Sequence, residues 1–117
     1  MMSYRKYNNR PTTIDGIRFD SKAEAARYRE LAILARAGEI EELELQPSFT
    51  LVPAFRDAAG RKHRAVTYTA DFAYTVDGQR VVEDVKGGRA TKTQAFRIKW
   101  KLAIRQNPSL CFVTVEA

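Results

Sequence analysis

Two aspartates and a lysine stand where a short hairpin would bring them together. The dipeptide Asp77-Gly78 separates two runs rich in Val, Tyr and Thr, a pattern typical of a two-residue type I′ turn. With this turn Asp71 lies opposite Asp84, and Lys86 follows on the same face. Like charges directly across a strand pair are destabilising. The pairing therefore predicts a compensating cation, either a bound divalent metal or Lys86.

The chemistry that suits these side chains is metal-assisted phosphodiester hydrolysis. Hard carboxylate oxygens without His or Cys ligands favour Mg²⁺, with Mn²⁺ as a substitute, over zinc. Such a metal would polarise a phosphate and lower the pKa of a bound water. Lys86 could orient that water or stabilise charge developing on phosphorus.

Two strands, residues 65–76 and 79–87, are expected to position this site. In the first, alternate residues from Val66 to Val76 form one continuous apolar face, and Asp71 lies on the other. In the second, Glu83 alternates to the face away from Asp84. We interpret Glu83 as a rim or salt-bridge residue.

A helix is predicted to begin near Ser21 and to stop near Gly38. The run Ser21-Lys-Ala-Glu24 fits a capping box, in which the serine and glutamate side chains each satisfy a backbone N–H. Glu24 also heads a mostly apolar stripe of this helix, so two interpretations stay open. It is either the capping partner of Ser21 or a third metal ligand that reaches inward.

A basic second helix is predicted over residues 91–105. The chain carries 20 Lys and Arg against 14 Asp and Glu, a net charge of +6, which favours an anionic partner such as nucleic acid. Phe96, Trp100 and Ala103 supply the apolar side of the helix. Its cations form either a solvated face or, as we favour, a DNA contact: Lys92, Arg97, Lys99, Lys101 and Arg105.

The remaining segments complete an α/β fold of order α-β-β-β-α-β. Further strands are expected at residues 40–45, an edge strand ending at Pro47, at 49–55 and at 110–115, with a polar, basic turn at 57–64. His63, the only histidine, is interpreted as structural or solvated. Residues 1–13 are expected to be a basic, flexible arm, and 14–117 a single domain containing a short hairpin at 14–19.

The same residues carry a family resemblance. Asp71, followed after a hairpin by Asp84-Val85-Lys86, resembles the PD-(D/E)XK motif of the restriction-endonuclease-like nuclease superfamily. The wider pattern resembles small phage-encoded members labelled as endonucleases or Holliday-junction resolvases, and it covers residues 4–115. Its remaining parts are Phe19-Asp-Ser-Lys-Ala-Glu24, Leu45-Gln-Pro47, Ala70-Asp-Phe72 and Val82-Glu-Asp-Val-Lys-Gly87.

The resemblance implies a mixed central sheet flanked by helices and Mg²⁺-dependent DNA cleavage. Asp71 and Asp84 would be metal ligands, Lys86 the catalytic lysine and Glu24 the acidic residue of the first helix. Gln46 would contact substrate or support the site, or would simply be a polar residue at a strand end. This chain departs from the pattern with Ala70 in place of proline. It also lacks the Gln-x-x-x-Tyr that some relatives carry on the following helix.

The leading functional hypothesis is a metal-dependent deoxyribonuclease acting on branched, nicked or duplex DNA. Resolution of a junction needs two coordinated cuts and would imply a homodimer. The alternatives are a DNA-binding module that does not cut, and a nuclease subunit of a larger phage or transposition assembly. With no signal peptide or apolar membrane-spanning run, we expect a cytoplasmic, phage- or prophage-encoded protein with no membrane partner.

Overall fold

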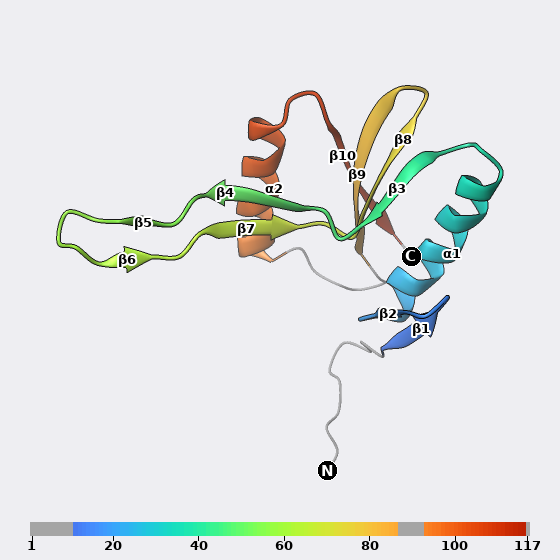
Figure 1. Ribbon diagram of the computed structural model, residues 1–117, viewed down its shortest axis with the longest axis horizontal. Coiled ribbons are helices and arrows are strands. Elements are labelled where there is room, and N and C mark those ends of the chain that lie inside the picture. The colour runs from blue at the N-terminus through green and yellow to red at the C-terminus, as the bar shows by residue number, and fades with distance from the viewer. Residues whose placement is uncertain (1–10, 87–92, 117) are drawn as a thin grey trace, which may run out of the picture.

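A four-stranded mixed sheet lies between two helices in the computed structural model, which describes residues 11–86 and 93–116 (Figure 1). The sheet has the order β10-β9-β8-β3, in which β10 runs parallel to β9 and the other pairs are antiparallel. The strands are β3 (Glu41–Leu45), β8 (Phe72–Val76), β9 (Gln79–Lys86) and β10 (Cys111–Glu116). The helices are α1 (Lys22–Arg36) and α2 (Gln94–Gln106). The predicted α/β class is thus confirmed, and β3 is the expected edge strand.

Each helix covers one face of the sheet, and a separate hydrophobic core lies between that helix and the sheet. Residues of β9 alternate between the two cores, because successive side chains of a strand point to opposite faces. Val85 packs in the core beneath α1, with Leu31, Phe72 and Tyr74. Val82 packs in the core beneath α2, together with Ala73, Tyr68, Ala70, Leu51 and Ala103. The central hairpin is therefore buried on both sides.

The register predicted for the hairpin is confirmed. Asp77 and Gly78 have φ angles of 49° and 81°, as a type I′ turn requires, and Val76 pairs with Gln79. The ladder continues in step to the pairing of Phe72 with Glu83.

The predicted strand over residues 65–76 is two strands, so the prediction of one continuous apolar face is wrong. β7 (Val66–Thr69) pairs with β4 (Ser48–Val52) outside the main sheet, whereas β8 pairs with β9. Between them the backbone N–H of Ala70 donates to Pro47 O and that of Asp71 donates to Glu83 O. Because the chain changes its partner strand at this point, Tyr68 and Ala70 pack in the core beneath α2, whereas Phe72 and Tyr74 pack in the core beneath α1.

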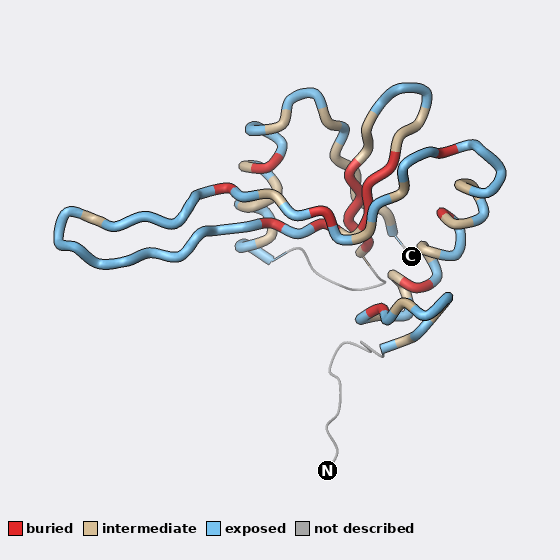
Figure 2. Tube along the Cα trace, viewed as in Figure 1, coloured by how far each residue is buried: buried red, intermediate tan, exposed pale blue. Residues whose placement is uncertain are grey.

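Residues 48–69 form a long two-stranded extension, which we call the ribbon arm. It consists of β4, β5 (Phe55–Arg56), β6 (Lys62–His63) and β7, and it projects away from the sheet (Figure 1). Its base packs against α2, while almost all of its length is exposed (Figure 2). The turn expected at 57–64 closes the end of this arm but is shorter than predicted, because Lys62 and His63 belong to β6. The strand expected at 49–55 is divided into β4 and β5.

The serine half of the predicted capping box and the predicted glycine stop are both in place at the ends of α1. Ser21 is the N-cap and its Oγ accepts the N–H of Glu24 at 3.1 Å. At the other end Gly38 has a φ of 78°, and the N–H groups of Gly38 and Glu39 donate to Ala35 O and Leu34 O. These two bonds make a Schellman motif, which explains why the helix stops there.

The N-terminal segment is more ordered than predicted. β1 (Thr12–Ile14) pairs with β2 (Ile17–Phe19) around Asp15 and Gly16, as the short hairpin expected at 14–19. The strand begins at Thr12, within the segment predicted to be a flexible arm, because Thr12 pairs with the buried Phe19. The rest of that predicted arm, residues 1–10, lies outside the described residues. No helix in the described part of the chain is long and apolar enough to cross a membrane.

Candidate active site

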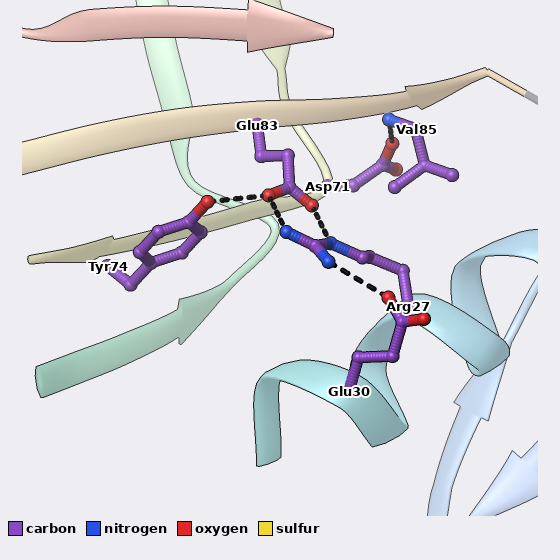
Figure 3. A network of polar contacts seen from close by, with 6 residues as sticks. All are labelled: Arg27, Glu30, Asp71, Tyr74, Glu83 and Val85. Atoms are coloured by element: carbon purple, nitrogen blue, oxygen red, sulfur yellow. Dashed lines mark hydrogen bonds and ion pairs between the residues drawn. The ribbon is translucent and has the colours of Figure 1, made fainter. Parts of the chain in front are cut away.

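The segment carrying Asp84 and Lys86 is tied directly to Asp71. Asp71 stands one residue before β8, and its Oδ2 accepts the backbone N–H of Val85 at 2.6 Å (Figure 3). Its own N–H donates to Glu83 O at 3.1 Å. Both bonds follow from the hairpin register, so Asp71 and Asp84 lie close together, as the sequence predicted.

Asp84 is held by two partners on the α2 side of the sheet. It is 7% exposed; its Oδ1 lies 2.8 Å from Lys86 Nζ, and its Oδ2 accepts a short hydrogen bond of 2.5 Å from Tyr68 Oη. Lys86 Nζ also lies 3.7 Å from the centre of the Phe96 ring, a cation–π contact. Of the two predicted compensating cations, Lys86 is in place.

The electrostatics of the site reflect buried acids of like charge. Burial and, to a smaller extent, the neighbouring Asp84 raise the pKa of Asp71 to about 6, although the Val85 N–H opposes this shift. Burial raises the pKa of Glu24 to about 7, and Asp71, Asp20 and Asp84 add to the shift. Glu24 therefore lies in the field of both aspartates.

The position of Glu24 is compatible with both interpretations of this residue. Its backbone N–H completes the helix cap with Ser21. Its carboxylate also interacts with the Ser21 side chain, which opposes the upward shift in the pKa of Glu24. Glu24 is half-buried at the start of α1. The negative charges of Asp71 and Asp84, on the sheet, help to raise its pKa.

Glu83 belongs to a separate network beneath α1. It is fully buried, and its two carboxylate oxygens accept from Arg27 Nε at 2.7 Å and Arg27 Nη2 at 2.9 Å (Figure 3). Tyr74 Oη donates to the same carboxylate at 2.7 Å, and Arg27 also pairs with Glu30. The salt-bridge interpretation is thus correct, whereas a rim position is wrong, because α1 covers this face of β9.

The donor chemistry of the site suits a hard divalent cation. A carboxylate offers about four lone-pair sites, and the bonds made by Asp71 and Asp84 occupy only part of that capacity. Oxygen donors of this type are those that Mg²⁺ and Mn²⁺ prefer. Among residues 11–86 and 93–116, however, no three acidic, His or Cys side chains are gathered into a ready-made metal centre.

The basic helix presents part of the predicted DNA-contacting set to solvent. Arg97, Lys101 and Arg105 are exposed on α2 and Lys99 is half-buried, while Lys92 lies outside the described residues. Arg97 and Lys101 line a shallow, open pocket on this helix, together with Gln94, Ile98 and Leu102.

Gln46 lies beside the site through its backbone. Its N–H donates to Asp71 O at 2.9 Å, and its φ of 53° ends β3 in a left-handed turn. Gln46 as a whole is an exposed residue. His63 lies near the far end of the ribbon arm, away from Asp71 and Asp84, which agrees with a structural or solvated residue.

Sequence reasoning missed two residues that fix the acids. The alternation from Val66 to Val76 places Tyr68 on an apolar face, and no motif marks Arg27. A hydroxyl or guanidinium on a half-apolar segment is a weak signal, because its partner lies 16 residues away in one case and 56 in the other.

Comparison with known proteins gives a family but no activity. Residues 4–114 match the family described as "Protein of unknown function (DUF1064)", and the chain belongs to this family. No curated protein and no solved structure matches it.

Proposed function

We propose that this protein is a metal-dependent DNA endonuclease with a restriction-endonuclease-like fold. The observation that carries the proposal is the arrangement of Asp71, Asp84 and Lys86. Two carboxylates meet at the end of paired strands, and an ammonium group lies 2.8 Å from one of them. Few structural roles need two acids so close, since each raises the cost of ionising the other.

The order of the main elements supports the fold assignment. The two helices and the four strands of the mixed sheet follow one another as α1, β3, β8, β9, α2 and β10. Counting these elements alone, the order agrees with the α-β-β-β-α-β order expected from the sequence, which supports the assignment. The hairpins β1–β2 and β4–β7 are additions to it.

In this proposal Asp71 and Asp84 hold Mg²⁺, with Glu24 as a third acidic group. Bound Mg²⁺ would neutralise charge on the scissile phosphate and lower the pKa of a water molecule. Lys86 is kept on the site side of β9 by Asp84 and Phe96, where its charge can face the phosphate. Tyr68 limits the rotation of the Asp84 carboxylate through its hydrogen bond.

The charge of the chain supports the proposal that the substrate is a polyanion. The net charge is +6, and exposed cations of α2 adjoin the core that contains Tyr68 and Phe96. We propose DNA as the substrate, with branched DNA as the form to test first. The two coordinated cuts that resolve a junction would imply a homodimer.

The experiment that tests the proposal is incubation of the protein with four-way junction, nicked, single-stranded and linear duplex DNA. Each substrate is treated with Mg²⁺, Mn²⁺ or EDTA, and Asp84→Asn is the control. The proposal expects cleavage in metal that disappears in EDTA and in Asp84→Asn. Cleavage that survives either treatment would exclude the metal mechanism, and binding without cleavage in every metal would favour a DNA-binding module.

A further inference from the structure

The ribbon arm is built to stand away from the body of the protein. Beyond Leu51 and Tyr68, which pack against α2, every residue from 52 to 67 is exposed except the half-buried Asp57 (Figure 2). An isolated two-stranded ribbon is only marginally stable in water. The arm therefore gains little from its own packing, which indicates that it serves a contact with something else.

The end of the arm is nevertheless shaped by specific bonds. Asp57 Oδ1 accepts the N–H groups of Ala59 at 2.8 Å and Arg61 at 3.0 Å, and Asp57 Oδ2 lies 2.8 Å from His63 Nε2. Across the ribbon, the rings of Phe55 and His63 stack 4.7 Å apart. The single acidic side chain of the arm is thus used to organise its turn.

The cations of the arm have no acidic partner among the described residues. The arm carries four cations, Arg56, Arg61, Lys62 and Arg64, against the one acid, a net charge of +3 and half of the +6 of the chain. Within the described part of the chain none of the four forms an ion pair, and Arg56 donates to Gly60 O.

Two of these cations face each other directly. Arg56 pairs with Lys62 across the ribbon, an arrangement of like charges that destabilises a strand pair. A polyanion would remove this repulsion, whereas an ordinary protein surface would supply few matching negative charges.

We propose that the ribbon arm lies along the groove of double-stranded DNA and places its cations on the flanking phosphates. The major groove of B-DNA accepts a two-stranded ribbon. Contacts between Arg or Lys and phosphate fix the position of a protein on the duplex without reading its sequence. This inference rests on the proposed function, since it takes DNA as the substrate.

The arm is connected to the candidate active site by its second strand. β7 carries Tyr68, which holds Asp84, and the chain reaches Asp71 two residues after the strand ends. DNA bound along the arm would therefore lead towards the two aspartates. The first strand is anchored as well, because Gln106 Nε2 on α2 donates to Leu51 O at 3.1 Å.

The test is binding of a fluorescent 30-base-pair duplex, measured by anisotropy in EDTA over a series of salt concentrations. One variant shortens the arm by replacing residues 53–65 with Asn-Gly, which joins the paired Val52 and Val66 through a two-residue turn. The second is Arg61→Gln/Lys62→Gln. Its matched control is Arg29→Gln/Arg36→Gln, which removes two exposed charges from α1.

We expect the shortened arm to weaken binding by roughly tenfold or more, and the Arg61/Lys62 variant to lower the salt slope of log K by about 1.8, with the control near wild type. Wild-type affinity and slope in both arm variants would overturn the inference while leaving the endonuclease proposal intact. Arm-dependent binding without cleavage in any metal would overturn the endonuclease proposal alone. A wild-type dimer that becomes monomeric when the arm is shortened would make the arm a contact between copies and also overturn the inference.

Discussion

Asp71 accepts the backbone N–H of Val85, the residue between Asp84 and Lys86, at 2.6 Å. This bond fixes the spacing of the two aspartates through the backbone. A carboxylate that bonds to backbone N–H is stabilised in its charged form, which offsets part of the cost of its burial. The candidate site is therefore organised by the hairpin itself.

Tyr68→Phe should destabilise the fold and misplace Asp84. The substitution keeps the ring, which packs against Phe49, Phe96 and Trp100, and removes the bond to Asp84. Because hydrogen bonds to charged groups contribute about 1.5–3 kcal/mol, we expect a loss of about 2 kcal/mol in urea unfolding.

Tyr28→Phe is the matched control for this prediction. Tyr28 Oη donates to Asp15 at 3.2 Å near the surface, so its loss should change the unfolding free energy by less than about 0.5 kcal/mol. Equal effects of the two substitutions would show that Tyr68 contributes through its ring alone.

Arg27→Met should be strongly destabilising, because it leaves the buried Glu83 charge without its cation. Breaking a buried ion pair costs about 3–5 kcal/mol. In Arg27→Met/Glu83→Gln the remaining charge is gone and Tyr74 keeps a partner, so we expect part of the stability to return. Additive effects in this double-mutant cycle would contradict a coupled pair, and Arg29→Met on the exposed side of α1 should be nearly neutral.

The stability of the metal-free protein should fall as the pH rises through the acidic range. The pKa values of Glu24 and Asp71 are raised to about 7 and about 6, so both groups bind more protons in the folded chain than in the unfolded one. Their stabilising effect is complete below the ordinary values of 4.5 and 3.8 and is lost as the pH passes the folded values.

Urea unfolding in EDTA at a series of pH values measures how the free energy of unfolding changes with pH. Glu24→Gln should make the free energy of unfolding less dependent on pH near pH 7. The exposed control Glu39→Gln should leave that dependence unchanged. If Glu24→Gln left the pH dependence of the unfolding free energy unchanged, this carboxyl group would be neither buried nor close to the aspartates.

Lys86→Gln should remove cleavage while leaving DNA affinity in EDTA nearly unchanged. The ammonium is confined by Asp84 and Phe96 and would act on the transition state, for which loss of one stabilising group costs about 10²–10³-fold in rate. Single-turnover cleavage and anisotropy separate the two effects. A parallel loss of affinity and rate would instead place Lys86 among the DNA-binding cations.

Local signals in the sequence predicted the central hairpin well. The Asp77-Gly78 turn fixes the register by itself, and strand alternation separates Glu83 from Asp84. The ends of α1 follow equally from Ser21 and Gly38, since caps depend on neighbouring residues.

The parts of the fold and of the site that the sequence does not predict depend on contacts between distant segments. Tyr68, Ala70 and Phe72 continue the apolar alternation across the point where the chain changes strand partner, so nothing in the pattern marks the break. Burial of β8 and β9 on both faces further weakens the signal, because apolar residues then suit either side. The pairing of Arg27 with Glu83 arises only when α1 packs on β9.

The central claim, that Asp71 and Asp84 form the cleavage site, is tested most directly by the single-turnover cleavage rate of Asp71→Asn in Mg²⁺. The amide oxygen of Asn can still accept the Val85 N–H, so the fold should persist and can be verified by urea unfolding. Loss of an anionic metal ligand should reduce the rate by roughly 10³-fold at saturating protein. A folded Asp71→Asn protein that cleaves DNA at the wild-type rate would contradict the account.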